Sequence, residues 1–159
     1  MARLVFDGNY QVFWLATAPA DAAAPTVAEI TAGTDLTAFI PKDGFKPGVS
    51  NNRVSGGSLD ELFLDESMGT WTSQLSVDYY LDKVTADNTA HTTFVQGATG
   101  AVVAIWDGGG NVAASKCFVW PAVECGMSVP LDTAENARQK ATAEFACQTA
   151  PNFHALVSA

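Results

Sequence analysis

The stretch GTWTSQLSVDYYLD, residues 69–82, carries the clearest structural pattern in the chain. Every second residue from Trp71 to Leu81 is Trp, Ser, Leu, Val or Tyr, whereas the intervening positions are mainly Thr, Gln, Ser and Asp. Successive side chains of a β-strand point to opposite faces of its sheet, so this alternation predicts a half-buried strand with one wet face. Asp78 and Asp82 fall on that wet face.

Segments before and after this strand are also rich in residue types that favour β-strands. We expect two strands joined by the turn Asp7-Gly8-Asn9 within residues 3–16, a short strand at 36–40, and longer strands at 101–106, 112–124 and 137–148. The run Asp107-Gly108-Gly109-Gly110-Asn111 suits a hairpin loop. Pro121 lacks an N–H donor, so it predicts a sheet edge or a bulge.

Two short helices are predicted. Thr26 and Glu29 form a capping-box pattern that starts a helix over 26–32. Asp87 is a candidate cap for a helix reaching about Gln96, with Gly97 as its stop.

Between these elements we expect an arm at about 17–25 and a long loop at about 41–70, whose part 41–57 is rich in Gly, Pro and Asn. The sum is a single domain, residues 1–159, mainly β with one flanking α-helix.

Composition limits the possible functions. Hydrophobic residues make up 48% of the 159 residues and charged residues only 16%, well below the usual quarter. Such a chain either has a large interior or hides much of its surface against partners. No run of eighteen apolar residues exists, and Asp7 ends the apolar run near the start, Leu4-Val5-Phe6, after only three residues. We therefore expect no membrane span, no secretory signal and synthesis in the cytoplasm.

The charge argues against a protein that grips nucleic acid. Eight basic residues against seventeen acidic ones give a formal charge of −9 and a pI near 4.4. Binding to phosphates requires clustered Lys and Arg, and the basic residues here are scattered.

Signatures of catalysis and metal binding are missing. Neither His91 nor His154 lies in a known sequence motif that pairs a histidine base with a Ser or Cys nucleophile. Cys117 and Cys125 are eight residues apart and have no nearby pair of histidines, so the spacing of a metal site is missing. Three cysteines do not suggest a disulfide framework, so we expect buried thiols. We therefore expect no enzyme, no metal and no cofactor. Trp in an apolar strand is more often a core or interface residue than a ligand platform.

Three stretches together resemble a known family. They are PTVAEITAGTDLT at 25–37, followed by Lys42-Asp43-Gly44; FVQGATG at 94–100; and DTAEN at 132–136, followed by the last long strand and Ala150-Pro151-Asn152. In order and spacing they resemble the tail tube proteins (major tail proteins) of siphoviruses, particularly of phages that infect actinobacteria. Residues 50–68 and 117–127 match that pattern less well.

The resemblance implies a β-sandwich or barrel-like subunit of the phage tail-tube type. Six such subunits would close into a ring, and rings would stack around a tape-measure protein, with tail-tip and tail-terminator proteins at the ends. Genomic DNA would pass down the lumen without specific binding. The protein would be part of the virion, assembled in the host cell cytoplasm.

Within that expectation, two groups of residues are candidate functional sites. Asp78 and Asp82 are candidates for the lumen wall, because an acidic wall repels DNA; the alternative is that they are solvated strand positions. The long loop and the arm are candidates for contact between rings; the alternative is that both are mobile surface loops. The candidate ring-stacking residues in the loop are Lys42, Asp43, Lys46, Asn51, Asn52 and Arg53.

A different class of function also remains open. A monomeric or trimeric β-sandwich binding module, for capsid decoration or host-glycan binding, fits the same composition. Its oligomeric state would distinguish it from a tube subunit.

Overall fold

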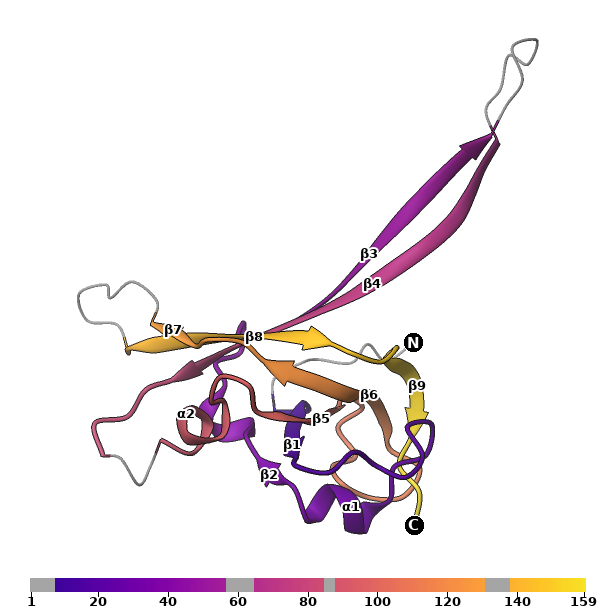
Figure 1. Ribbon diagram of the computed structural model, residues 1–159. Helices are drawn as coiled ribbons and strands as arrows, with labels where there is room; N and C mark the ends of the chain where they lie inside the picture. The colour runs from indigo at the N-terminus through magenta and orange to yellow at the C-terminus, as the bar shows by residue number, and fades with distance from the viewer. Residues whose placement is uncertain (1–7, 57–64, 85–87, 131–137) are drawn as a thin grey trace.

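The computed structural model describes residues 8–56, 65–84, 88–130 and 138–159. The longest elements are two strands, β3 and β4, which form one hairpin (Figure 1). In chain order the elements are β1 (Gln11–Leu15), α1 (Val27–Thr31), β2 (Thr34–Asp35), the 3₁₀ turn η1 (Thr37–Phe39), β3 (Phe45–Gly56), β4 (Asp65–Tyr80), α2 (Thr89–Thr93), β5 (Thr99–Ile105), β6 (Lys116–Cys125), β7 (Val129–Pro130), β8 (Lys140–Cys147) and β9 (Asn152–Leu156).

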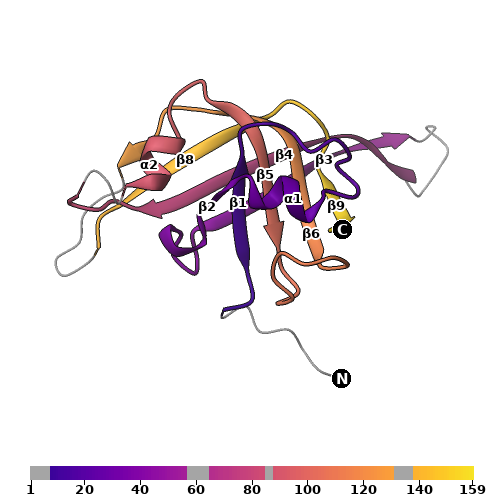
Figure 2. The same cartoon turned by 90° about the horizontal axis from the view of Figure 1, so that it is seen from below.

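The strands form one antiparallel sheet that folds over itself into a β-sandwich. Its order is β2-β1-β5-β6-β8-β4-β3, with β7 paired to β8 and β9 paired to β6. Strand β6 makes the corner: residues 116–119 pair with β9, and residues 123–125 pair with β8. Figures 1 and 2 show β4 and β8 in one layer, with β1 and β5 in the other.

Both faces of β1 and β5 are covered. Alternate residues of β1 enter different clusters: Val12 and Trp14 pack in the main core toward β4 and β8, whereas Phe13 and Leu15 pack with α1 and the C-terminal segment. Because both faces are buried, these strands are apolar without alternation, while β4 alternates and has one wet face.

Several sequence predictions are confirmed. Strand β4 contains the alternation, with Leu75, Val77 and Tyr79 buried. Strands β5, β6 and β8 lie close to the predicted segments. The predicted irregularity at Pro121 is a bulge, because Gly100 lies opposite Val123 and Val102 opposite Trp120.

The prediction of an irregular loop at about 41–70 is wrong for most of its length. Residues 45–56 form β3, and β4 begins at Asp65. The Gly, Pro and Asn residues of this segment have low intrinsic strand propensity, but backbone pairing with β4 outweighs that unfavourable propensity. Pro47 is tolerated because β3 is the outermost strand of the sheet.

The short strand predicted at 36–40 is also wrong. A two-residue strand, β2, ends at Asp35, and η1 follows. The Asp35 side chain accepts a hydrogen bond from the Thr37 N–H at 2.9 Å, and the Thr37 hydroxyl accepts one from the Val12 N–H at 3.1 Å. Asx-type side-chain bonds of this kind favour a turn over a strand.

The structure differs in detail from three further predictions. The second helix is only Thr89–Thr93, and its predicted cap, Asp87, lies outside the described residues. Of the two strands expected within 3–16, only the second, β1, falls inside the described residues. The expected arm at 17–25 is a loop packed on the C-terminal segment, because the Ser158 N–H donates to the Pro25 carbonyl at 2.8 Å.

Helix α1 has the capping box that the sequence predicts. The Glu29 N–H donates to the Thr26 hydroxyl at 3.1 Å, and the Thr26 N–H donates to the Glu29 carboxylate at 2.8 Å. Hydrogen bonds from the N–H groups of Ala20 and Thr26 lower the pKa of Glu29. Ile30, fully buried, anchors this helix to the second cluster.

Thr26→Ala is expected to lower the free energy of unfolding by about 1 kcal/mol, because α1 loses its N-cap acceptor. Urea denaturation followed by circular dichroism measures the difference. Thr26→Ser keeps the hydroxyl and is the matched control. Equal losses in both variants would contradict a capping role.

Candidate functional site

The β3–β4 hairpin projects beyond the body of the protein (Figure 1). Strand β4 pairs with β8 only from Gln74 to Tyr80, so its first part, residues 65–73, pairs with β3 alone. Beyond Gln74 the hairpin is therefore a two-stranded ribbon, and within the described chain the outer edge of β3 has no strand partner. A two-stranded ribbon is marginally stable in water, so this one suits contact with another chain.

One face of the hairpin is apolar and continues the core outward. Residues directly opposite each other share a face, and this face carries Leu75 and Val77, which are buried under the body. Farther out it carries Val49 and Trp71, which are 47% and 44% exposed. The apolar face therefore extends past the core that could cover it.

The opposite face is polar, and Asp78 on β4 connects its strands through side-chain contacts. Its carboxylate accepts a hydrogen bond from the Lys46 ammonium at 2.5 Å and from the Thr142 hydroxyl at 2.6 Å. These contacts join β3, β4 and β8 at the base of the hairpin. Burial by itself would raise the pKa of Asp78, but the hydrogen bonds from Lys46 and Thr142 and the nearby charges of Lys46 and Lys140 lower the pKa overall.

Lys46→Met is expected to destabilise the fold by about 1 kcal/mol at pH 7, since the Asp78 carboxylate loses a charged donor that is itself half exposed. The lowered pKa of Asp78 means that its stabilisation is present above the ordinary aspartate pKa, about 3.9, and is lost as the pH falls through the folded-state pKa. The difference between variant and unmodified chain should therefore shrink below about pH 4.

Urea unfolding at pH 7 and pH 3 measures this difference. Arg53→Met is the control, because the Arg53–Glu66 pair at 3.1 Å is exposed on both sides and should contribute under about 0.5 kcal/mol. A loss in Lys46→Met that is independent of pH would contradict the role of the Asp78 charge.

The two acidic residues predicted for the lumen wall have different surroundings. Asp78 is on the outer face of the sheet but only 5% exposed, within its ion pair. Asp82 follows β4 and is exposed, and its carboxylate accepts a hydrogen bond from the Lys83 N–H at 2.9 Å.

The predicted ring-stacking residues occupy two places. Asn51, Asn52 and Arg53 lie on β3 in the projecting ribbon, where Asn52 donates to the Thr70 hydroxyl at 3.1 Å. The others lie at its base: Lys46 on β3, and Lys42 and Asp43 in the turn before it. The carboxylate of Asp43 lies 3.7 Å from the Lys140 ammonium.

Sequence reasoning missed the exposed apolar residues of the ribbon. They are Val49, Val54, Met68 and Trp71. A signal existed: the alternation of the 69–82 stretch begins at Trp71, before the part of β4 that the body covers.

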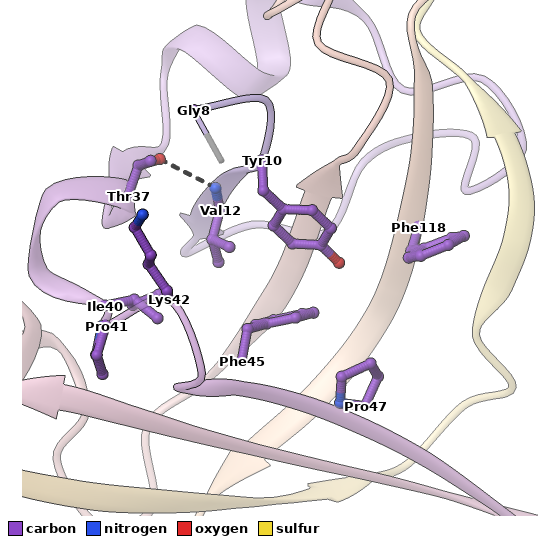
Figure 3. A pocket seen from close by; sticks show the side chains of 10 residues that line it. All are labelled: Gly8, Tyr10, Val12, Thr37, Ile40, Pro41, Lys42, Phe45, Pro47 and Phe118. Atoms are coloured by element: carbon purple, nitrogen blue, oxygen red, sulfur yellow. Dashed lines mark hydrogen bonds between the residues drawn. The ribbon is translucent and has the colours of Figure 1, made fainter. Parts of the chain in front are cut away.

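An apolar pocket of about 420 Å³ lies beside the base of the hairpin (Figure 3). Tyr10, Phe45 and Phe118 supply its aromatic walls, and the Tyr10 and Phe45 rings are 5.4 Å apart. Figure 3 shows Thr37 and Lys42 on one side of the space and Phe118 and Pro47 on the other. Burial raises the pKa of the Tyr10 phenol.

The polar groups of the core do not form a catalytic arrangement among the described residues. The three cysteines are free, and burial raises the pKa of Cys117 and of Cys125 to about 11, which disfavours the reactive thiolate. His91 hydrogen-bonds through Nδ1 to the Tyr79 hydroxyl at 2.9 Å. The described part of the chain has no group of three or more His, Cys, Asp or Glu side chains able to hold a metal ion. In that same part, no helix has both the length and the apolar character needed to cross a membrane.

A β-sandwich whose longest hairpin leaves the body, with an apolar face that its own core does not cover, defines a structural subunit for assembly with other chains. The chain matches the family model described as phage tail tube protein over residues 1–159, and it belongs to that family. It is therefore a structural tail protein of a bacteriophage virion.

A solved structure supports the fold. The chain is similar to one in the cryo-EM structure of the anti-feeding prophage baseplate, 6-fold symmetrised, with a TM-score of 0.57 and 13% identity. The match covers 94% of this chain and 95% of the other. No curated protein matches the sequence.

Proposed function

We propose that this chain polymerises as stacked hexameric rings into the tube of a long, siphovirus-type phage tail, which conducts genomic DNA during ejection. The observation that carries this proposal is the projecting β3–β4 ribbon with its exposed apolar face. Burial of that face requires another chain. In a tail tube the most abundant other chain is a second copy.

Sheet edges support ring closure. Among the described residues, no strand pairs with the outer edge of β3, which is 12 residues long, and an edge of this length tends to pair with another strand. Joining this edge to a different edge of a neighbour is a head-to-tail contact, which can close into a ring.

The polar face of β3, β4 and β8 is the proposed lumen wall. It carries mainly uncharged side chains, such as Ser50, Thr72, Gln74 and Ser76. A wall of this kind offers DNA few cations, so it permits sliding. Asp78 lies on this face in its ion pair, and the exposed Asp82 at its end adds negative charge.

Asp82→Lys is expected to slow DNA ejection, because each ring would present six added cations to the phosphates in the proposed hexamer. Ejection from assembled tails, followed by dye fluorescence, measures the rate. Asp82→Asn, which removes charge without reversing it, is the control. Unchanged ejection from intact Asp82→Lys tails would contradict a lumen position.

The remaining parts of the proposal follow from the family. The subunit would contact the tape-measure protein inside the tube and the tail-tip and tail-terminator proteins at its ends, after assembly in the host cytoplasm. Its role would be structural, without catalysis.

One observation favours the alternative of a binding module for capsid decoration or host glycans. The pocket at Tyr10, Phe45 and Phe118 has the aromatic lining and size of a small-ligand site. Such a module would remain monomeric or trimeric at high concentration.

Negative-stain electron microscopy of the purified protein at high concentration, with light scattering alongside, tests the proposal. Sixfold rings or hollow tubes are the expected result. A chain that stays monomeric or trimeric, even after addition of the tail-tip complex, would contradict the tube function and favour the binding module.

A further inference from the structure

The apolar pocket beside the base of the hairpin is built from three segments that are distant in the sequence. Tyr10 precedes β1, Phe45 begins β3, and Phe118 lies within β6. Their rings surround the space in Figure 3, and the buried Val12 lines it between them. A pocket that needs all three segments at once exists only in the folded chain.

Two of the aromatic walls are supported from behind by tryptophan side chains. Phe45 and Phe118 both pack edge-to-face on the buried Trp120, with ring centroids 5.6 and 6.3 Å away. Phe118 also stacks on Trp106, with centroids 5.6 Å apart. Ring contacts of this kind have preferred geometries, so these walls resist collapse into the space.

The backbone beside the pocket is also fixed. The ring of Pro41 restricts its own backbone, and its carbonyl accepts a hydrogen bond from the Gly44 N–H at 2.8 Å. The Gly44 carbonyl in turn accepts one from the Asp78 N–H at 2.7 Å, which ties this turn to β4. The pocket is therefore formed before a ligand arrives, and a preformed site lowers the cost of binding.

The volume and the lining define the chemical class of ligand. The pocket holds about 420 Å³, whereas an apolar cavity of roughly 150 Å³ is enough to bind benzene. The space therefore suits roughly two or three linked aromatic rings. Burial raises the pKa of the Tyr10 phenol, so its hydroxyl is neutral at neutral pH and brings no negative charge to the pocket.

Lys42 gives one side of the pocket a positive charge. Among the described residues that line the space, it alone is charged, and Figure 3 shows its side chain beside Thr37. The carboxylate of the next residue, Asp43, lies 3.7 Å from the Lys140 ammonium. An acidic group on the ligand is therefore favoured on the Lys42 side, since opposite charges attract.

We propose that this pocket binds an aromatic acid, with its rings between Tyr10, Phe45 and Phe118 and its acidic group toward Lys42. The site goes beyond the proposed tube function, because a subunit can carry it whether or not the chain polymerises. Since Phe45 begins β3, a bound ligand also adds contacts at the root of the ribbon.

Two fluorescent probes that differ by one acidic group test the site. Anilinonaphthalene sulfonate is an aromatic acid, and phenylnaphthylamine has the same rings without the sulfonate. Fluorescence titration and calorimetry of the purified protein should show one molecule of either probe per chain. Lys42→Met should weaken the sulfonate probe by about threefold to fivefold, as expected for an exposed charge, and leave the neutral probe unchanged. Equal effects on both probes would overturn the assignment of the acidic group.

Filling the pocket should weaken both probes at least tenfold. Ile40→Trp and Pro47→Phe each place a larger ring among the lining residues. Pro47 lies on the outermost strand, so the second variant keeps the test valid if the first does not fold. Val49→Phe is the matched control, because it adds the same ring farther along β3, outside the pocket.

The exposed apolar face of the ribbon is the competing place for the probes. Trp71→Ser combined with Val49→Ser removes that face and should leave both titrations unchanged. Loss of binding in this double variant, or unchanged binding in the filled-pocket variants, would overturn the proposed site. A lack of binding to the unmodified chain would also overturn it and leave the tube function standing, because electron microscopy of rings and tubes tests that function separately.

Discussion

Trp71→Ser combined with Val49→Ser is expected to raise the critical concentration for assembly by roughly 30-fold or more. Tryptophan at the centre of an interface typically contributes about 2 kcal/mol or more, and about 1.4 kcal/mol corresponds to a tenfold change in the association constant. In the proposed hexameric ring, six copies of each contact act together, so at ordinary concentrations no tubes should form. Sedimentation and electron microscopy across a dilution series measure this threshold.

The body of the double variant should remain folded. Trp71 and Val49 lie on the part of the hairpin that β8 does not pair, so their loss removes little of the core. Val112→Ser is the matched control, because Val112 is a valine of similar exposure outside the hairpin. Normal assembly of the double variant would show that the apolar face of the ribbon is not an interface.

Trp120→Ala is expected to lower the free energy of unfolding by about 3–5 kcal/mol, because Trp120 is the largest fully buried side chain among the described residues. The Trp120 side chain is fully buried and lies within 5.6 to 6.3 Å, between ring centroids, of Phe45, Phe118 and Phe153. Its indole N–H donates to the Ser73 hydroxyl at 3.2 Å. Truncation removes all of these contacts and leaves a cavity.

Urea denaturation measures the loss, and Trp120→Phe is the graded comparison. The phenylalanine keeps one aromatic ring in the site but loses the bond to Ser73 and part of the indole volume, so it should cost less than alanine. A cost for Trp120→Ala of under about 1.5 kcal/mol would mean that the site collapses around the missing ring.

Trp120 also links the core to the ribbon that we propose as the assembly surface. Phe45, the first residue of β3, packs edge-to-face on Trp120, while Ser73 marks the point where β4 leaves the body. The direction of the ribbon is therefore set by the core and by the Lys46–Asp78 pair on the opposite face. A destabilised core should weaken assembly even when the ribbon sequence is intact.

Local patterns in the sequence were sufficient for several elements. The alternation from Trp71 to Leu81 predicts β4 and its buried face, since the period of two is a direct consequence of strand geometry. Thr26 and Glu29 predict the start of α1, because a capping box involves only residues three apart. The resemblance of residues 25–37 and 94–100 to tail tube proteins led to the correct family.

The hairpin strand β3 could not be predicted from local patterns. Its Gly, Pro and Asn residues predict turns, and the strand exists because β4 supplies a partner for its backbone, from Gly56 opposite Asp65 to Phe45 opposite Val77. The same reason explains the missed strand β9, which pairs with β6 across more than thirty residues. Pairing at such separations depends on the fold as a whole.

The sequence by itself determined the strand periodicity, the cap of α1, the low charge content and the family, because each depends on residue types or on neighbours along the chain. Only the tertiary structure decided that Asp78 is paired rather than free, and that Val49 and Trp71 are left uncovered. Those properties depend on which distant segments the folded sheet brings together, and no local pattern encodes them.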